Sequence, residues 1–176
     1  MQAHREARLN LTNVPAVARD YAKGEGNVLV QLFDKTGNEI TRREGRNLVV
    51  QDGMAFMANR IFSSTPKVMN FLQLGKNGTA ASTTNSDILT PLASATLAAR
   101  QTVGTVAMSG ARTAKFEHTW TAGEFAASGL EEAGLFNEIT TAGVAGTAWT
   151  MLARFVYTLV NKTGSDTLGL MGALAA

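Results

Sequence analysis

Residues 148–160 read AWTMLARFVYTLV, and this stretch decides the fold. Aliphatic, β-branched and aromatic residues dominate it, and such side chains fit the pleated surface of a sheet. Gly146 and Gly164 flank it, and glycine interrupts a strand because it has no side chain to pack. The composition and the glycine boundaries together predict the strongest β-strand of the chain.

Alternation of apolar and polar residues marks two further strands. Lys115–Thr121 places Phe116, His118 and Trp120 on one face and the Lys, Glu and Thr side chains on the other. In Thr167–Leu174, Leu168, Leu170 and Gly172 likewise occupy every second position. Both stretches therefore predict strands with one face in the core.

A hairpin is predicted near the start of the chain. Val28–Phe33 is an apolar run, Asp34–Asn38 has the composition of a turn, and Glu39–Thr41 returns as a second strand. Short strands are also expected in four other places, at Asn47–Val50, Lys67–Leu74, Thr96–Met108 and Glu131–Ile139.

One amphipathic helix is expected after Asp52, whose carboxylate can cap its first turn. The apolar residues that follow are spaced by three and four and share one face: Met54, Met57, Ala58, Ile61 and Phe62. A single helical turn is also expected at Asp87–Leu92, where Pro91 prevents a longer one. The many short strands predict a mainly β fold, an antiparallel β-sandwich or jelly-roll-like barrel.

The length of 176 residues fits one domain. Residues 1–27 are polar and lack a sustained apolar period, so they are expected to form an extended N-terminal arm outside a single β domain at 28–176. Two interpretations of the arm remain open, a disordered terminus and a strap that orders on a neighbouring subunit. Charged residues make up 17% of the chain against about 25% in typical domains, which suggests surface covered by partners.

The overall charge gives little support for nucleic acid as a partner. The net charge is +2, from 16 basic and 14 acidic residues. The chain has no cysteine, which excludes disulfides and thiolate metal sites. It starts without a secretory signal and has no apolar run of about 18 residues, so neither secretion nor a membrane partner is expected.

Catalytic and metal-binding motifs are missing from the sequence. His4 and His118 are the only histidines, and neither has the spacing of a metal motif or an evident orienting partner. Glu131 and Glu132 are adjacent, so as strand residues they should face opposite sides and not act as a catalytic pair. One of the two is expected to point outward, and the other to form a structural ion pair with a basic residue such as Arg154, because a buried charge needs a partner. No enzyme activity and no cofactor are predicted.

Arg42, Arg43 and Arg46 form a basic cluster around Glu44, expected at the end of a hairpin. No aromatic residues are interleaved with them, so a solvated loop is expected. If the cluster has a role, an acidic patch on a protein neighbour fits as well as a phosphate backbone. The candidate assembly contacts are these three arginines together with residues of the arm, namely Arg5, Arg8, Arg19 and Tyr21.

Four stretches, in this order, carry a family resemblance: NLVVQDGMAFMANRIF (47–62), FLQLGKNGTAASTTNSDILTPL (71–92), FEHTWTAGEFAASGLEEAGLFNE (116–138) and MLARFVYTLVNKTGSDTLGL (151–170). The order of these landmarks resembles small virion proteins of tailed phages, which include capsid decoration proteins and attachment domains of tail fibres. The resemblance implies a structural β-sandwich that oligomerises or docks on a shell, with Glu132 and Arg154 as internal braces. The arm lies outside it.

The expected function is that of a capsid decoration or cement protein. Such a protein would be made in the cytoplasm of the host bacterium and would sit in the virion as a homo-oligomer, such as a trimer, bracing the major capsid protein. The alternative is a tail-fibre, baseplate or adaptor module that takes part in receptor binding, with aromatic residues such as Trp120 and Trp149 on a glycan.

Overall fold

Nine antiparallel strands and one helix make up the part of the chain that the computed structural model describes, residues 25–62, 68–92, 101–108, 113–137 and 150–175. The helix is α2 (Gln51–Phe62). The strands are β1 (Glu25–Phe33), β2 (Glu39–Val49), β3 (Phe71–Gly75), β4 (Gln101–Thr102), β5 (Thr105–Met108), β6 (Thr113–Trp120), β7 (Ala127–Phe136), β8 (Met151–Lys162) and β9 (Thr167–Ala175). The expected mainly β fold with one short helix is confirmed.

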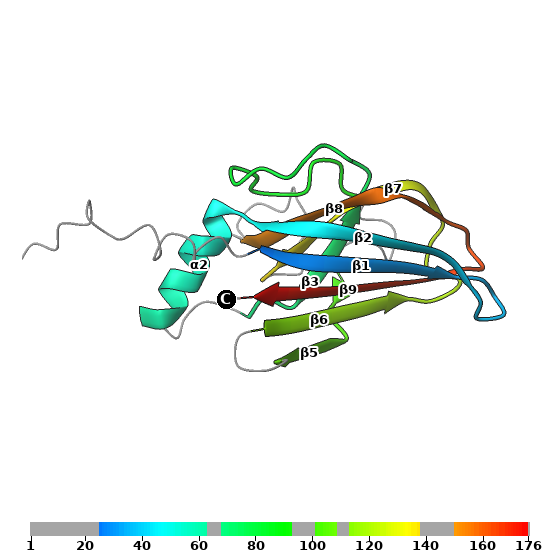
Figure 1. Ribbon diagram of the computed structural model, residues 1–176, viewed down its shortest axis with the longest axis horizontal. Coiled ribbons are helices and arrows are strands. Elements are labelled where there is room, and N and C mark those ends of the chain that lie inside the picture. The colour runs from blue at the N-terminus through cyan, green and yellow to red at the C-terminus, as the bar shows by residue number, and fades with distance from the viewer. Residues whose placement is uncertain (1–24, 63–67, 93–100, 109–112, 138–149, 176) are drawn as a thin grey trace, which may run out of the picture.

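The strands form one sheet in the order β4-β3-β7-β8-β2-β1-β9-β6-β5, and this sheet is nearly closed (Figure 1). Its two edge strands, β4 and β5, are separated in the chain only by Val103 and Gly104. The amide of Val103 donates to the carbonyl of Asn70 at 2.7 Å, and the amide of Gly104 donates to the carbonyl of Glu117 at 2.8 Å. A single stretch of chain thus pairs first with β3 and then with β6, which gives the sheet its barrel-like form.

The inward faces of the strands build the core. Val28, Val30 and Leu32 alternate along β1 as buried residues, and Trp120 and Phe155 are completely buried. The rings of Phe116 and Phe155 lie 5.4 Å apart between centroids. The ring of Phe116 also lies against the backbone of Gly172, where a Cβ atom would stand 2.0 Å from Phe116 Cζ. Glycine is therefore required at position 172 for this ring to fit.

The predicted hairpin joins β1 to β2, and a carboxylate organises its turn. Asp34 accepts hydrogen bonds from the amides of Thr36 at 2.8 Å and Asn38 at 2.9 Å. These hydrogen bonds hold the pKa of Asp34 well below its usual range, the side-chain bond from Thr36 contributing most.

The strand predicted from residues 148–160 is β8, and those predicted at 115–121 and 167–174 are β6 and β9.

Three local predictions need correction. β2 runs without a break from Glu39 to Val49, where two short strands were expected, because the charged residues between Thr41 and Asn47 keep the pairing with β1 and alternate between its two faces. β1 begins at Glu25, so residues 25–27 belong to the sheet and not to the arm. The rest of the predicted arm, residues 1–24, lies outside the described residues. Asp87–Leu92 forms no helical turn, because the backbone amides of Leu89 and Thr90 bind a carboxylate of β7.

Helix α2 lies at one end of the sheet and contacts β8 (Figure 1). Asp52 stands in its first turn, where a negative charge stabilises the exposed amides of the helix. Met54 packs against the core as predicted, but the side chain of Met57 is 41% exposed and does not belong to the packed face.

Candidate functional site

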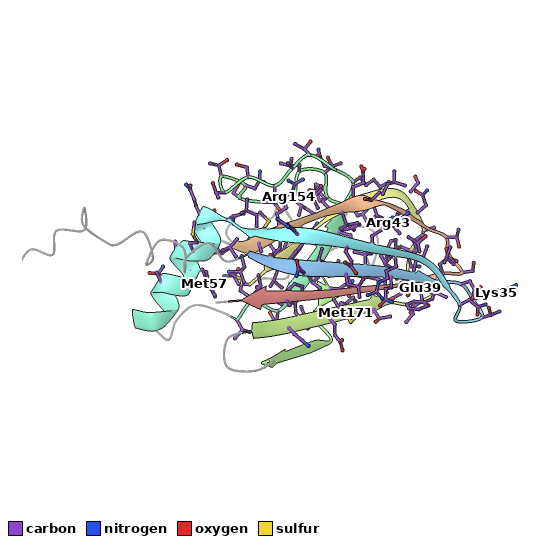
Figure 2. The ribbon with its side chains drawn as sticks, viewed as in Figure 1. Lys35, Glu39, Arg43, Met57, Arg154 and Met171 are labelled. Carbon is purple, nitrogen blue, oxygen red and sulfur yellow. The ribbon has the colours of Figure 1, made fainter. Side chains whose placement is uncertain are left out.

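The most distinctive site is an ion pair on the outward face of the sheet. Glu132 of β7 and Arg154 of β8 stand on the face opposite to Ala133 and Phe155, which fill the core. Arg154 Nε lies 2.8 Å from Glu132 Oε2, and both side chains are fully buried. Arg154 is labelled in Figure 2. The pair predicted from the sequence is therefore present.

The 76–92 segment, which follows β3, buries this pair. Arg154 Nη1 donates to the carbonyl of Thr79 at 2.9 Å, and Arg154 Nη2 donates to the carbonyl of Asn77 at 3.0 Å. Near the other end of the segment, the amides of Leu89 and Thr90 donate to the two carboxylate oxygens of Glu132 at 3.0 and 2.7 Å. One ion pair thus holds both ends of the segment against the sheet.

Burying two charges costs several kcal/mol per ion, and their attraction offsets this cost only when the remaining donors and acceptors are also bonded. The backbone of the 76–92 segment supplies these bonds. A loop that lies on a sheet must in turn satisfy its own amides and carbonyls, and the ion pair does this for four of them. The ion pair and the loop conformation therefore depend on each other.

Neighbouring groups reinforce this arrangement. A Cβ atom on Gly75 would lie 2.5 Å from Glu132 Oε1, so only glycine leaves room for the carboxylate at that position. The hydroxyl of Tyr157 donates to the carbonyl of Glu132 at 3.2 Å. Burial raises the pKa of Tyr157 far above its ordinary value, and the carboxylates of Glu132 and Glu131 raise it further, so the hydroxyl keeps its proton. Ile88 anchors the segment in a small apolar cluster with Val50, Phe136 and Met151.

The outer surface of the 76–92 segment is polar and uncharged between Asn77 and Ser86. Thr79, Thr83 and Thr84 are exposed on it, and Leu89 adds an apolar side chain that is 47% exposed. Local hydrogen bonds give the loop its shape, among them one from the Ser82 amide to the Asn85 side chain at 2.8 Å. A surface fixed in this way binds a partner with little further loss of conformational entropy.

His118 is half-buried on the inward face of β6, and its ring meets that of Trp120 edge to face at 4.5 Å between centroids. Burial lowers the pKa of His118 below its ordinary value of 6.5, although the backbone of Thr102 and the charge of Glu124 act in the opposite direction. Trp120 is completely buried, so the expectation that it stacks on a glycan is wrong. Trp149 lies outside the described residues.

The predicted basic cluster divides between the two faces of β2. Arg42 and Arg46 point outward, whereas Arg43 points inward with the neighbouring Val30. Arg42 Nη2 lies 3.5 Å from Glu44 Oε1, and both side chains are exposed. The cluster therefore lies within a strand, and the expected hairpin-end loop is wrong. The other candidate contacts, Arg5, Arg8, Arg19 and Tyr21, fall in the part of the chain that is not described.

Lys162 is a buried charge that the sequence did not reveal. Its Nζ donates to the carbonyl of Phe125 at 2.9 Å and lies 4.8 Å from the centroid of that ring. Burial lowers the pKa of Lys162, and the carboxylates of Asp166 and Glu124 oppose this effect. The only signal in the sequence was its position at the end of a long strand. That signal is weak, because a lysine there usually extends into solvent.

Among the described residues, no three His, Asp or Glu side chains come close enough together to hold a metal ion. Within the same ranges, no helix is both long and apolar enough to cross a membrane. The chain matches no protein-family model, no curated protein and no solved structure.

Proposed function

We propose that this chain is a structural subunit of a phage virion that binds other proteins without catalysing a reaction, in the role of a capsid decoration or cement protein. The observation that carries the proposal is the fully buried pair of Glu132 and Arg154, which fixes the 76–92 segment as a defined surface.

Charge is used here to hold a backbone in place. In an active site, titratable side chains converge on a space that a substrate can enter, and their protonation is tuned for proton transfer. Here the carboxylate and the guanidinium are covered by the loop, and their remaining hydrogen bonds go to its backbone and to the side chain of Asn85. This arrangement favours recognition of a partner over chemical turnover.

The assignment to a capsid rests on the resemblance to small virion proteins and on the kind of surface that the loop offers. A neutral surface rich in hydroxyl groups, with Leu89 exposed on it, suits many contacts of modest strength. Repeated over a symmetric shell, such contacts add up without any single tight site.

The second candidate is a receptor-binding or adaptor module of the tail, and the absence of charge between Asn77 and Ser86 favours it. The hydroxyl and amide groups of this stretch suit the hydrogen bonds that sugar hydroxyls make.

Copy number in purified virions tests the proposal, measured by quantitative mass spectrometry against a labelled standard of this chain. Hundreds of copies per particle support the decoration role. A number near a dozen supports the tail module, because tail structures carry few copies under their rotational symmetry. Absence of the chain from the particle would refute both.

Binding to shells tests the site itself. Purified chain is added to particles that lack it, with Thr83→Arg as the variant in the 76–92 segment and Lys35→Glu at the exposed hairpin tip as the control. We expect the first change to abolish binding and the second to leave it unchanged. Equal binding by both variants would show that the 76–92 segment does not belong to the interface with the shell.

A further inference from the structure

The outward face of β2, β1, β9 and β6 has a regular charge pattern that plays no part in the proposed function. Register aligns Glu44, Leu29, Met171 and Glu117 in one row across the four strands. The next outward row, two residues further along each strand, contains Arg46, Asn27, Ala173 and Lys115. We call these the acidic row and the basic row.

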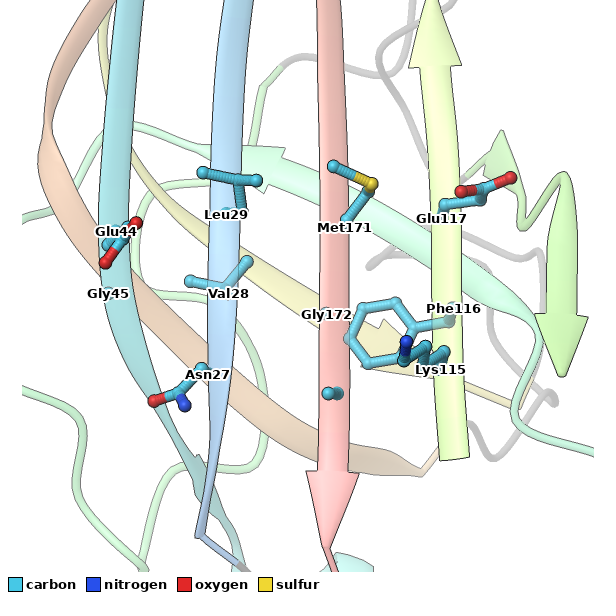
Figure 3. A pocket seen from close by; sticks show the side chains of 11 residues that line it. Asn27, Val28, Leu29, Glu44, Gly45, Lys115, Phe116, Glu117, Met171 and Gly172 are labelled. Carbon is cyan, nitrogen blue, oxygen red and sulfur yellow. The ribbon is translucent and has the colours of Figure 1, made fainter. Parts of the chain in front are cut away.

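A shallow hollow of about 440 Å³ lies between the two rows (Figure 3). Its floor is the backbone of the row between them, where Val28 and Phe116 turn their side chains into the core. On one side of the hollow Met171 is 39% exposed, and on the other side the small side chain of Ala173 leaves space. The charged ends of both rows are exposed.

We propose that this face pairs with the same face of a second copy of the chain, around a two-fold axis that runs across the strands, above the floor of the hollow and midway between the two faces. Such an axis exchanges the two rows. It therefore places Glu117 opposite Lys115 of the second copy, and Glu44 opposite its Arg46, each contact occurring twice. Met171 of each copy then fits over the small Ala173 of the other.

The charge pattern selects this axis over the other two-fold arrangement. An axis parallel to the strands would place Glu44 opposite Glu117, and like charges in direct opposition are destabilising. An axis across the strands makes all four charged contacts attractive. Each residue of a strand rises about 3.4 Å, so the acidic and basic rows lie about 7 Å apart. Because the axis passes midway between them, each acidic row comes to lie opposite the basic row of the other copy.

The contact is expected to be weak. A patch four strands wide and a few residues deep is smaller than the roughly 800 Å² per partner of a standard interface, so dissociation in the micromolar range is expected. Its charged ends are exposed, so added salt should weaken it. Glu44 also contacts Arg42 of its own chain, which makes the pair on β6 the better one to test.

Charge reversal on β6 of the full-length chain gives the test, with sedimentation equilibrium as the measurement. Lys115→Glu places two carboxylates opposite each other at both contacts, and Glu117→Lys places two ammonium groups there. We expect each variant alone to weaken self-association at least tenfold. The double variant Lys115→Glu/Glu117→Lys reverses each pair, keeps the composition and should dimerise like the original chain.

A mixture of the two single variants provides an independent check. One copy then carries two acids on β6 and the other two bases, so the mixture should form heterodimers although neither variant pairs with itself. Native mass spectrometry with one variant isotopically labelled measures this directly. A shared melting temperature for all variants confirms that folding is unchanged.

Several outcomes overturn the proposal. The first is an original chain that stays monomeric at protein concentrations about ten times above the expected micromolar dissociation constant. The second is a trimer in place of a dimer, and the third is a double variant that remains monomeric. The last result would mean that residues 115 and 117 do not face each other across a two-fold axis, because that arrangement restores both attractive pairs when the two charges are exchanged. None of these results bears on copy number or on the 76–92 segment, so the proposed function is tested separately.

Discussion

Replacing Arg154 by methionine should detach the 76–92 segment from the sheet. The change removes the partner of a buried carboxylate and three hydrogen bonds with well-defined geometry, to Glu132, Asn77 and Thr79. Breaking a buried ion pair from one side costs about 3–5 kcal/mol. Since about 1 kcal/mol lowers the melting temperature of a domain of this size by roughly 2–4 °C, the expected decrease is about 6–20 °C.

Matched variants separate the ion pair from general effects of the substitution. Arg42→Met makes the same chemical change at an exposed position and should alter stability by less than about 0.5 kcal/mol. Arg154→Lys keeps the charge but lacks the planar fork that reaches Asn77 and Thr79 together, so it should fall between methionine and the original residue.

Hydrogen exchange then shows where the stability is lost. In the double variant Glu132→Leu/Arg154→Met no charge is left unpaired, so much of the global stability should return. The amides of Leu89 and Thr90 have lost their acceptor, however, and should exchange much faster than in the original chain. A melting temperature of Arg154→Met within about 2 °C of the original, or protected amides at these two positions in the double variant, would refute the reasoning.

Three further changes test other parts of the structure. Gly172→Ala should destabilise the chain by about 1–3 kcal/mol in urea denaturation, because the added methyl group meets the ring of Phe116, and Phe116→Leu in the same chain should restore most of the loss. Leu89→Asp should change the free energy of unfolding by less than about 0.5 kcal/mol, since the side chain is exposed, yet it should weaken binding to shells in the add-back assay. Because burial lowers the pKa of His118, the unfolded chain binds that proton more tightly; the stability from this group is present above its ordinary pKa of 6.5 and falls at lower pH. The decrease in melting temperature on acidification should therefore be smaller in His118→Leu than in the original chain.

The strands were predictable where one face is buried and the other is not. In β6, Phe116 and Trp120 alternate with exposed polar residues, and this alternation directly indicates which face is buried and which is exposed. In β2 the same period is present but hidden, because Arg43 occupies an inward position between Arg42 and Glu44. The three charged residues therefore read as a loop, and the strand was divided in two.

Closure of the sheet could not be read from the sequence. It depends on the chain around Val103 and Gly104 joining β3 to β6, and pairing between distant strands leaves no local period. The ion pair was predictable, since a buried Glu and a buried Arg each need a partner. Its effect on the 76–92 segment was not, because the amides of Leu89 and Thr90 and the carbonyls of Asn77 and Thr79 are backbone groups that every residue has.

The two proposed surfaces have a geometric relation that leads to a last prediction. The 76–92 segment lies beyond β2, at the opposite end of the row direction from β6 (Figure 1), and Ala80 and Ala81 border a hollow beside Arg46. The proposed axis runs along the row direction, and a rotation about an axis leaves every position along it unchanged. Both copies of the segment would therefore lie at the same end of the dimer, where both can contact one shell.

If both proposals hold, Glu117→Lys should weaken binding to shells although position 117 is remote from the 76–92 segment. Linking two binding surfaces makes the second contact intramolecular, and loss of the link returns each copy to its own weaker affinity. The double variant Lys115→Glu/Glu117→Lys should bind like the original chain, because its dimer is restored. Unchanged shell affinity in the monomeric Glu117→Lys variant would show that one copy is sufficient, and the dimer would then serve a purpose other than attachment to the shell.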